Sequence, residues 1–192
     1  RIVNWMQAIS PNLADGYVAV FDERGLRVVA DGFRFTNEIR FDAAEEWLYV
    51  VETTGRCITR LRIDDQCEVT ARETFGPADT RGFIDGIAFD SHGNLWGTHV
   101  MSDRIFAITP EGDFRVILED DNPAPSKVLY DAFARDAVTP DLMLACGGKL
   151  APWFASVTFG GPDLKTVYVG SLRGTRIPFF QSPVAGLPMS HW

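Results

Sequence analysis

Three polar side chains stand at equivalent places in three similar stretches of this sequence. Asn37, Asp85 and Ser156 each lie two residues after a phenylalanine. An amide, a carboxylate and a hydroxyl can bind a polar ligand, hold a hard cation or move a proton. The chain contains no G-x-S-x-G stretch, so a serine nucleophile of the hydrolase type is not expected. The chemistry therefore depends on where the fold places these three residues.

The residues that follow each of these positions have the pattern of a β-hairpin. Short β-branched and aromatic strands are separated by turn residues, as at Asp90-Ser91-His92-Gly93-Asn94. When the hairpins are closed at these turns, each polar residue of a first strand faces a polar residue of the second. Facing polar residues indicate a functional site, because a structural core prefers apolar ones. The predicted pairs are Asn37 with Glu52, Asp85 with His99, and Ser156 with Ser171.

The hairpins also repeat along the chain. Asp85 follows Asn37 by 48 residues, and each unit has room for four short strands. Repetition at about 40 to 50 residues with four strands per unit is typical of a β-propeller. The sequence therefore predicts an all-β fold, a single β-propeller domain over residues 1–192 made of four-stranded blades. The strands that begin near Asn37, Asp85 and Ser156 would be innermost and would ring one mouth of the central channel. A sandwich with similar hairpins is the alternative.

Residues 120–153 form a long connection between two strand-rich units. The outer strand of a four-stranded blade returns to the face where the next inner strand begins, so this inter-blade insertion is predicted to lie over the same channel mouth. Loops of this length are uncommon in compact domains and often cover binding sites. A surface decoration is the alternative. Weak helical periodicity predicts one helix near residues 128–137.

Charge and cysteine content narrow the classes of partner. The chain has 18 Lys and Arg against 26 Asp and Glu, a net charge of −8, without the basic cluster of a nucleic-acid binder. Its apolar runs fall short of the roughly 18 residues that a membrane span needs. Cys57, Cys67 and Cys146 lack metal-site spacing, which predicts free thiols and a cytoplasmic location. We expect a small-molecule partner, without nucleic acid or membrane, and the sequence does not define an oligomeric state.

Several of these stretches together resemble one known family. Residues 85–96, Asp-Gly-Ile-Ala-Phe-Asp-Ser-His-Gly-Asn-Leu-Trp, resemble the blade signature of the gluconolactonase and regucalcin (senescence marker protein) family. Thr36-Asn37-Glu38-Ile39 resembles the Asn-Gly-Ile/Leu strand of that family, and residues 159–169 resemble its last blade. Residues 186–192 are similar to the tail of common bacterial members. The likeness covers most of residues 17–118 and 150–192, with the motifs in the order and spacing of the family.

The resemblance implies a six-bladed propeller that binds one divalent cation and hydrolyses sugar lactones or related esters. Asn37 and Asp85 match the motif positions of two metal ligands, and Asp85 would also be the catalytic general base. Ca²⁺ is the expected ion, with Zn²⁺, Mn²⁺ and Mg²⁺ as alternatives. Four further residues are expected to contact substrate or to support the ligands: His99, Glu52, Ser156 and Ser171.

Two features depart from the family. Glu38 stands where the family has a glycine, and the metal-binding glutamate of the first blade has no counterpart in this chain. At about 40 residues per blade, six blades need roughly 240 residues. We therefore expect an N-terminally truncated propeller of about three and a half blades, inactive by itself.

Two other functions remain open, because a fold alone does not specify chemistry. One is a non-catalytic propeller that binds a small ligand or a protein. The other is an esterase or phosphotriesterase on the same scaffold. A divalent cation at the mouth would distinguish the lactonase from the first, and substrate trials would distinguish it from the second.

Overall fold

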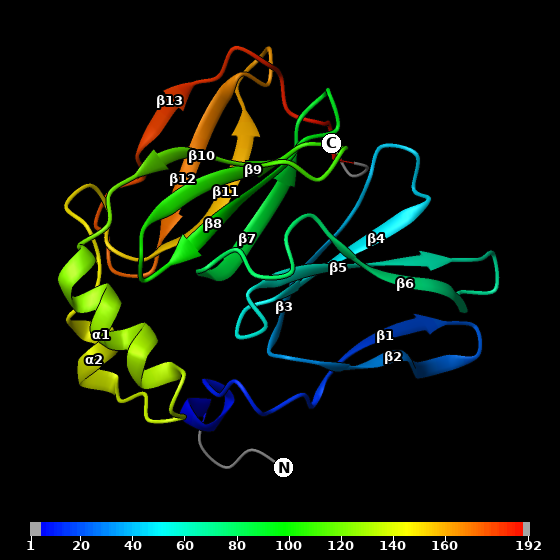
Figure 1. Cartoon of the computed structure of the whole chain (residues 1–192). Coiled ribbons are helices and arrows are strands. Elements are labelled where there is room, and N and C mark those ends of the chain that lie inside the picture. Colours follow the sequence, from blue (N-terminus) through cyan, green and yellow to red (C-terminus); the bar gives the residue numbers. More distant parts are fainter. Residues whose placement is uncertain (1–4, 190–192) are drawn as a thin grey trace.

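A computed structural model describes residues 5–189 as four antiparallel β-sheets and three short helices (Figure 1). The all-β prediction is confirmed for these residues. Residues 190–192, which belong to the tail that resembles the family, lie outside them. The strands are β1 (Gly16–Asp22), β2 (Gly25–Phe33), β3 (Thr36–Phe41), β4 (Trp47–Glu52), β5 (Cys57–Ile63), β6 (Val69–Phe75), β7 (Phe83–Phe89), β8 (Leu95–Val100), β9 (Arg104–Ile108), β10 (Phe114–Glu119), β11 (Phe154–Gly160), β12 (Thr166–Ser171) and β13 (Phe179–Gln181).

Each sheet is a meander whose first strand lies at one edge. The orders are β1-β2, β3-β4-β5-β6, β7-β8-β9-β10 and β11-β12-β13. The edge strands β3, β7 and β11 lie side by side with β7 in the middle. Gly86 of β7 is so close to β11 that an added Cβ would lie 2.7 Å from both the Ala155 carbonyl oxygen and the Ser156 Cα. The predicted arrangement of adjacent inner strands is confirmed, and the sheets follow one another along an open arc in Figure 1.

Apolar cores hold consecutive sheets face to face. Val18 and Phe33 of the first sheet pack against Leu48, Val50 and Leu61 of the second. Similar clusters join the second sheet to the third and the third to the fourth. Every inner strand is therefore fixed by packing on its own sheet and on a neighbour, which gives the polar residues on it a rigid support.

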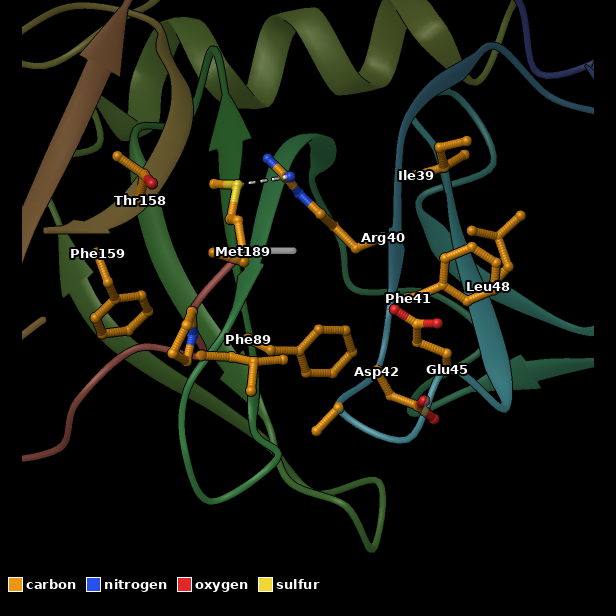
Figure 2. A pocket seen from close by; sticks show the side chains of 14 residues that line it. Ile39, Arg40, Phe41, Asp42, Glu45, Leu48, Phe89, Thr158, Phe159 and Met189 are labelled. Carbon is orange, nitrogen blue, oxygen red and sulfur yellow. Dashed lines mark hydrogen bonds between the residues drawn. The ribbon is translucent and has the colours of Figure 1, made fainter. Parts of the chain in front are cut away.

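The far ends of the inner strands border a cavity of about 370 Å³ (Figure 2). Phe41, Phe89 and Phe159 line it, together with the segment Leu187-Pro188-Met189. The Arg40 Nη1 lies 3.3 Å from the Met189 sulfur and holds that segment against β3. These phenylalanines stand at or next to the last residues of their strands, whereas Asn37 and Asp85 stand near the first. The cavity is thus at the opposite end of the strands from the predicted site.

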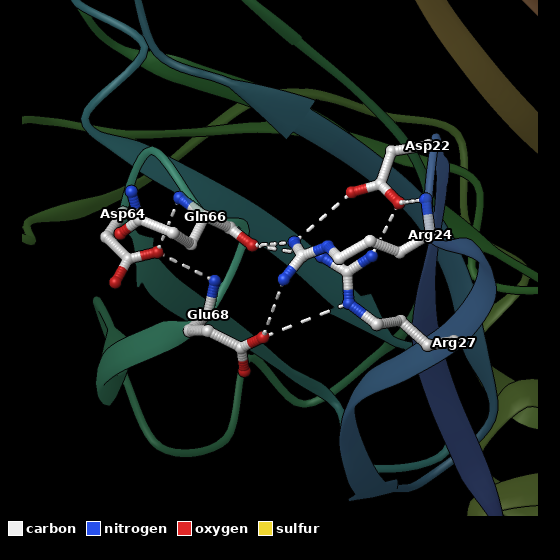
Figure 3. A network of polar contacts seen from close by, with 6 residues as sticks. All are labelled: Asp22, Arg24, Arg27, Asp64, Gln66 and Glu68. Carbon is white, nitrogen blue, oxygen red and sulfur yellow. Dashed lines mark hydrogen bonds and ion pairs between the residues drawn. The ribbon is translucent and has the colours of Figure 1, made fainter.

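A polar network joins the outer turns of the first two sheets (Figure 3). Arg27 Nη1 lies 2.7 Å from Asp22 Oδ1, and Arg27 Nη2 donates to the Gln66 carbonyl oxygen at 2.9 Å. The hydrogen bond from Arg27 lowers the pKa of Asp22 to about 2. Glu68 lies 3.8 Å from Arg27 Nε and 3.9 Å from Arg24 Nη1. Exposed pairs of this kind contribute little energy, so the network mainly orients the β1–β2 turn on the next sheet.

The insertion at residues 120–153 contains two helices, α1 (Pro123–Phe133) and α2 (Pro140–Leu144). The helix predicted near residues 128–137 is wrong in its bounds, because α1 begins and ends several residues earlier. Pro123 and Pro140 each open a helix, where the fixed φ of proline is favourable and its missing N–H is not needed. Both helices of the insertion therefore begin at a proline.

One face of the β1–β2 hairpin is apolar and exposed. Tyr17, Phe21, Leu26 and Val28 are each more than half exposed, and Phe21 reaches 80%. The opposite face of the same hairpin carries Val18, which is buried against the second sheet. Apolar residues on both faces are typical of strands that are covered on both sides. Within residues 5–189, no helix is long and apolar enough to cross a membrane.

Candidate functional site

A β-bulge occurs near the start of all three inner strands. Pairing shifts by one residue at Asn37-Glu38 in β3, at Asp85-Gly86 in β7 and at Ala155 in β11. The bulges make the predicted cross-strand pairs wrong, because the extra residue moves each partner along the strand. Glu52 pairs with Thr36, His99 with Ile84, and Ser171 with Phe154. Bulges re-aim side chains and are frequent beside functional sites.

The bulges bring Asn37 and Asp85 into direct contact. Asn37 Nδ2 donates to Asp85 Oδ1 at 2.6 Å and lies 3.1 Å from the Thr53 hydroxyl. Asn37 is exposed and Asp85 is half-buried, so the pair borders open space. Burial raises the pKa of Asp85 to about 6, opposed by the hydrogen bond from Asn37 and supported by the negative charge of Glu38. The pair expected from sequence therefore meets across two sheets.

Glu38 connects the two strands that carry this pair. One oxygen of its carboxylate accepts a hydrogen bond from the Ile87 N–H at 2.8 Å, and the other lies 2.5 Å from Arg40 Nη2. Arg40 Nε in turn donates to the Ile87 carbonyl oxygen at 3.3 Å. Both backbone groups of Ile87 on the open edge of β7 are thus satisfied by side chains of β3. This clamp gives a structural reason for a glutamate at this position.

Glu52 supports its own sheet and faces away from Asn37. Its side chain is buried, accepts the Arg34 N–H at 2.8 Å and accepts the Thr59 hydroxyl at 2.6 Å. These contacts fix the chain entering β3 and brace β5. The structure therefore places Glu52 as an internal brace of the sheet.

The two serines occupy different environments. Ser156 is exposed on β11, and its Oγ lies over Gly170, where an added Cβ would be only 2.1 Å away. Ser171 closes the turn after β12, because its Oγ accepts the Gly174 N–H at 2.7 Å and donates to the Pro152 carbonyl oxygen. Ser156 stays beside the inner strands, next to Gly86, whereas Ser171 holds a turn together.

His99 lies inside the third sheet. Its ring is fully buried against Phe106 and Phe114, with centroid distances of 4.8 and 6.1 Å. Its Nε2 lies 3.0 Å from the Thr80 hydroxyl. The hydrogen bonds of His99 and of Asp85 thus go to different partners. The structure places His99 as a packed core residue.

The burial of His99 predicts a pH-dependent stability. Desolvation, with the nearby positive charges of Arg104 and Arg56, lowers its pKa from 6.5 to about 3. Stability that depends on the neutral ring is fully present above pH 6.5 and is lost as the pH falls toward 3. One such group contributes about 1.4 kcal/mol per pH unit to the slope of the free energy of unfolding against pH.

We expect His99→Phe to reduce the acid-side slope of the free energy of unfolding between pH 6.5 and 4. Urea unfolding at several pH values measures it. His92→Phe, at an exposed histidine on the β7–β8 turn, is the matched control and should keep the wild-type slope. An unchanged slope in His99→Phe would contradict the assignment.

The insertion is anchored close to the Asn37–Asp85 pair. The buried Asp103 carboxylate accepts the N–H groups of Gly148 at 2.5 Å and Phe154 at 2.8 Å. The hydroxyl of Tyr130, on α1, accepts the Phe83 N–H at 3.3 Å, two residues before Asp85. The helices also pack on Phe83, Val100 and Met101. The insertion therefore sits at the end of β7 where Asp85 lies.

The donor set at this end suits a hard divalent cation in part. A carboxylate and an amide oxygen are the ligand types that Ca²⁺ and Mg²⁺ prefer. No hydrogen bond reaches Asn37 Oδ1 within residues 5–189, so that oxygen is free to coordinate. The same residues hold no cluster of three or more His, Cys, Asp and Glu side chains of the kind that binds a metal. Asn37 and Asp85 therefore fit a cation as two ligands of a larger shell.

Two relatives in sequence are lactonases by name. The chain is 24% identical over 156 residues to 6-deoxy-6-sulfogluconolactonase of Pseudomonas putida, covering 80% of this chain and 44% of that protein. It is 28% identical over 148 residues to pentonolactonase XacC of Haloferax volcanii, covering 76% and 41%. The chain thus spans less than half the length of either relative.

A solved structure shares the fold. A calcium-binding protein, regucalcin, from Agrobacterium tumefaciens superimposes with a TM-score of 0.60 at 16% identity, over 86% of this chain and 47% of that one. Residues 5–130 match the family described as SMP-30/Gluconolactonase/LRE-like region. The bulges of β3 and β7 and the Asn37–Asp85 pair lie within that match. The chain is therefore a member of the SMP-30/gluconolactonase family.

Proposed function

We propose that this chain forms part of a divalent-cation-dependent hydrolase that opens sugar lactones by attack of water. The observation that carries the proposal is the hydrogen-bonded Asn37–Asp85 pair, set by bulges at the same end of two adjacent inner strands. Membership of the family and the names of the two lactonase relatives support the substrate class. Ca²⁺ is the proposed ion, with Zn²⁺, Mn²⁺ and Mg²⁺ as alternatives, and the likeness to a calcium-binding regucalcin supports the choice of Ca²⁺.

Asp85 is the proposed general base. Its carboxylate accepts a proton from water as the water oxygen bonds to the lactone carbonyl carbon, and the ring C–O bond then breaks with a proton delivered to the ring oxygen. One lactone and one water molecule thus give one open-chain hydroxy acid. A bound divalent cation would supply polarisation of the carbonyl and a lowered pKa of water. Asn37 orients Asp85 through its N–H and offers Oδ1 as a ligand.

The rest of the site is proposed to come from further blades. A hard cation takes six or more oxygens, and this chain offers two protein ligands. The exposed apolar face of β1–β2 suits packing by another sheet. We therefore place the chain as the C-terminal part of a six-bladed propeller in which residues 120–153 cover the channel mouth. The 192-residue chain alone is expected to be inactive and to bind cations weakly.

The test uses the full-length gene product and a series of aldonolactones. Hydrolysis followed by pH-stat should require a divalent cation and should stop after chelation. Asn37→Ala should weaken Ca²⁺ affinity by roughly tenfold to a hundredfold, with activity partly restored by added Ca²⁺. Asn12→Ala, at an exposed loop asparagine, is the matched control.

Three results would count against this function. Full activity after chelation would exclude the cation-dependent mechanism. Preference for aryl esters or organophosphates would favour the esterase or phosphotriesterase. Lactone binding without turnover would favour a non-catalytic binding propeller.

A further inference from the structure

Thr53 lies between the two strands that carry the candidate ligands. It follows β4, is 4% exposed, and its N–H donates to the Phe35 carbonyl oxygen at 3.0 Å. Its hydroxyl lies 2.7 Å from the Ile84 carbonyl oxygen and 3.1 Å from Asn37 Nδ2. Thr53 therefore contacts the start of β3, the side chain of Asn37 and the backbone next to Asp85.

The hydroxyl of Thr53 determines which way the Asn37 amide faces. A carbonyl oxygen only accepts hydrogen bonds, so the single hydroxyl proton of Thr53 goes to Ile84. Toward Asn37 the hydroxyl can then only accept, and the group facing it must be the amide NH₂. The second N–H of that group donates to Asp85 Oδ1 at 2.6 Å. With both N–H groups held, Asn37 Oδ1 points away from Thr53 and from Asp85.

We propose that Thr53 is a positioning residue that sets the Asn37 amide with its oxygen toward the bound divalent cation. The inference rests on the proposed cation-dependent function and adds a residue outside the ligand set. Without the hydroxyl, the Asn37 amide keeps only its hydrogen bond to Asp85, so its oxygen is held less firmly toward the cation. Groups that orient a metal ligand in this way typically change metal affinity by about 10- to 100-fold when removed.

The test compares two substitutions in the full-length gene product. Thr53→Val keeps the shape of the side chain and removes the hydroxyl, whereas Thr53→Ser keeps the hydroxyl. Calorimetric titration with Ca²⁺ should give an affinity about 10- to 100-fold weaker for Thr53→Val. The affinity of Thr53→Ser should be close to that of the wild type. Thermal melting of each apo protein shows whether the variant is folded.

Thr59→Val is the matched control. Thr59 is also buried, and its hydroxyl donates to Glu52 Oε1 at 2.6 Å, away from Asn37. This variant should lose thermal stability and keep its Ca²⁺ affinity. Equal affinities in Thr53→Val and Thr59→Val would overturn the positioning role, as would a Thr53→Ser variant as weak as Thr53→Val.

The outcomes also separate this inference from the function on which it rests. If the wild-type protein binds Ca²⁺ through Asp85 and the Thr53→Val variant binds it equally well, the inference about Thr53 is overturned and the proposed function stands. A wild-type protein that binds no divalent cation overturns both.

Discussion

Asp85→Asn should lower kcat for lactone hydrolysis by about 10²- to 10⁴-fold in the full-length gene product. The amide has nearly the shape of the carboxylate, and its oxygen can still accept the hydrogen bond from Asn37. It cannot take the proton of an attacking water at neutral pH. The loss should therefore fall on kcat more than on KM. Initial rates over a range of lactone concentrations measure both.

Asp79→Asn is the matched control for this prediction. Asp79 is exposed and pairs with Arg56 near the surface, so the same change of charge occurs outside the site. Its kcat should stay at the wild-type value, and both variants should give wild-type circular dichroism. Wild-type turnover in Asp85→Asn would move the role of general base to another residue of the complete protein.

Asp90→Asn should lower the free energy of unfolding by about 3 kcal/mol, the largest stability effect that we expect. Asp90 is 2% exposed, and its Oδ1 accepts the N–H groups of His92 and Asn94 at 2.9 and 3.0 Å. Its Oδ2 accepts Asn94 Nδ2 at 2.8 Å and Trp96 Nε1 at 2.9 Å. In an asparagine, an NH₂ group would replace one of the two oxygens and face two of these donors. Because both groups are donors, the two hydrogen bonds would be lost. Urea unfolding measures the change.

Asp42→Asn is the control for the stability prediction. Asp42 holds the same place in the preceding repeat, but among residues 5–189 its side chain accepts only the Glu46 N–H, at 3.0 Å. We expect a loss below about 1 kcal/mol. Equal losses at the two positions would show that the four bonds of Asp90 are not the cause. The contrast also explains part of the Asp-Ser-His-Gly-Asn-Leu-Trp stretch physically, since His92, Asn94 and Trp96 all donate hydrogen bonds to the Asp90 carboxylate.

The sequence was sufficient to predict the repeats and the meeting of Asn37 with Asp85, because both depend on period and strand order. It was not sufficient to predict the side-chain pairing around them. A bulge adds one residue to a strand, and the residue types at Asn37-Glu38 and Ala155 do not predict it. Gly86 was a possible signal, because glycine inside a strand often marks a bulge or a close approach of backbones.

The supporting residues were harder to find than the ligands. Thr53 was missed because its role depends on the Ile84 carbonyl oxygen of the next sheet, which no local pattern predicts. His99 was expected beside Asp85 on the assumption of regular pairing. The bulge moves it to Ile84, and its ring packs against two phenylalanines. Errors of this kind arise where tertiary contacts decide the direction of a side chain.

The repeated bulges also bear on how such a site can change over evolutionary time. A residue at a bulge lies outside the regular ladder of paired residues, so replacing it disturbs strand pairing less than a change elsewhere in the strand. Positions 37 and 85 can therefore exchange polar groups while the scaffold around them persists. Libraries that randomise these two positions should yield a larger share of folded variants than libraries at the paired positions beside them. New substrate specificities on this scaffold would then arise by substitution at the bulge positions, without insertions or rearranged sheets.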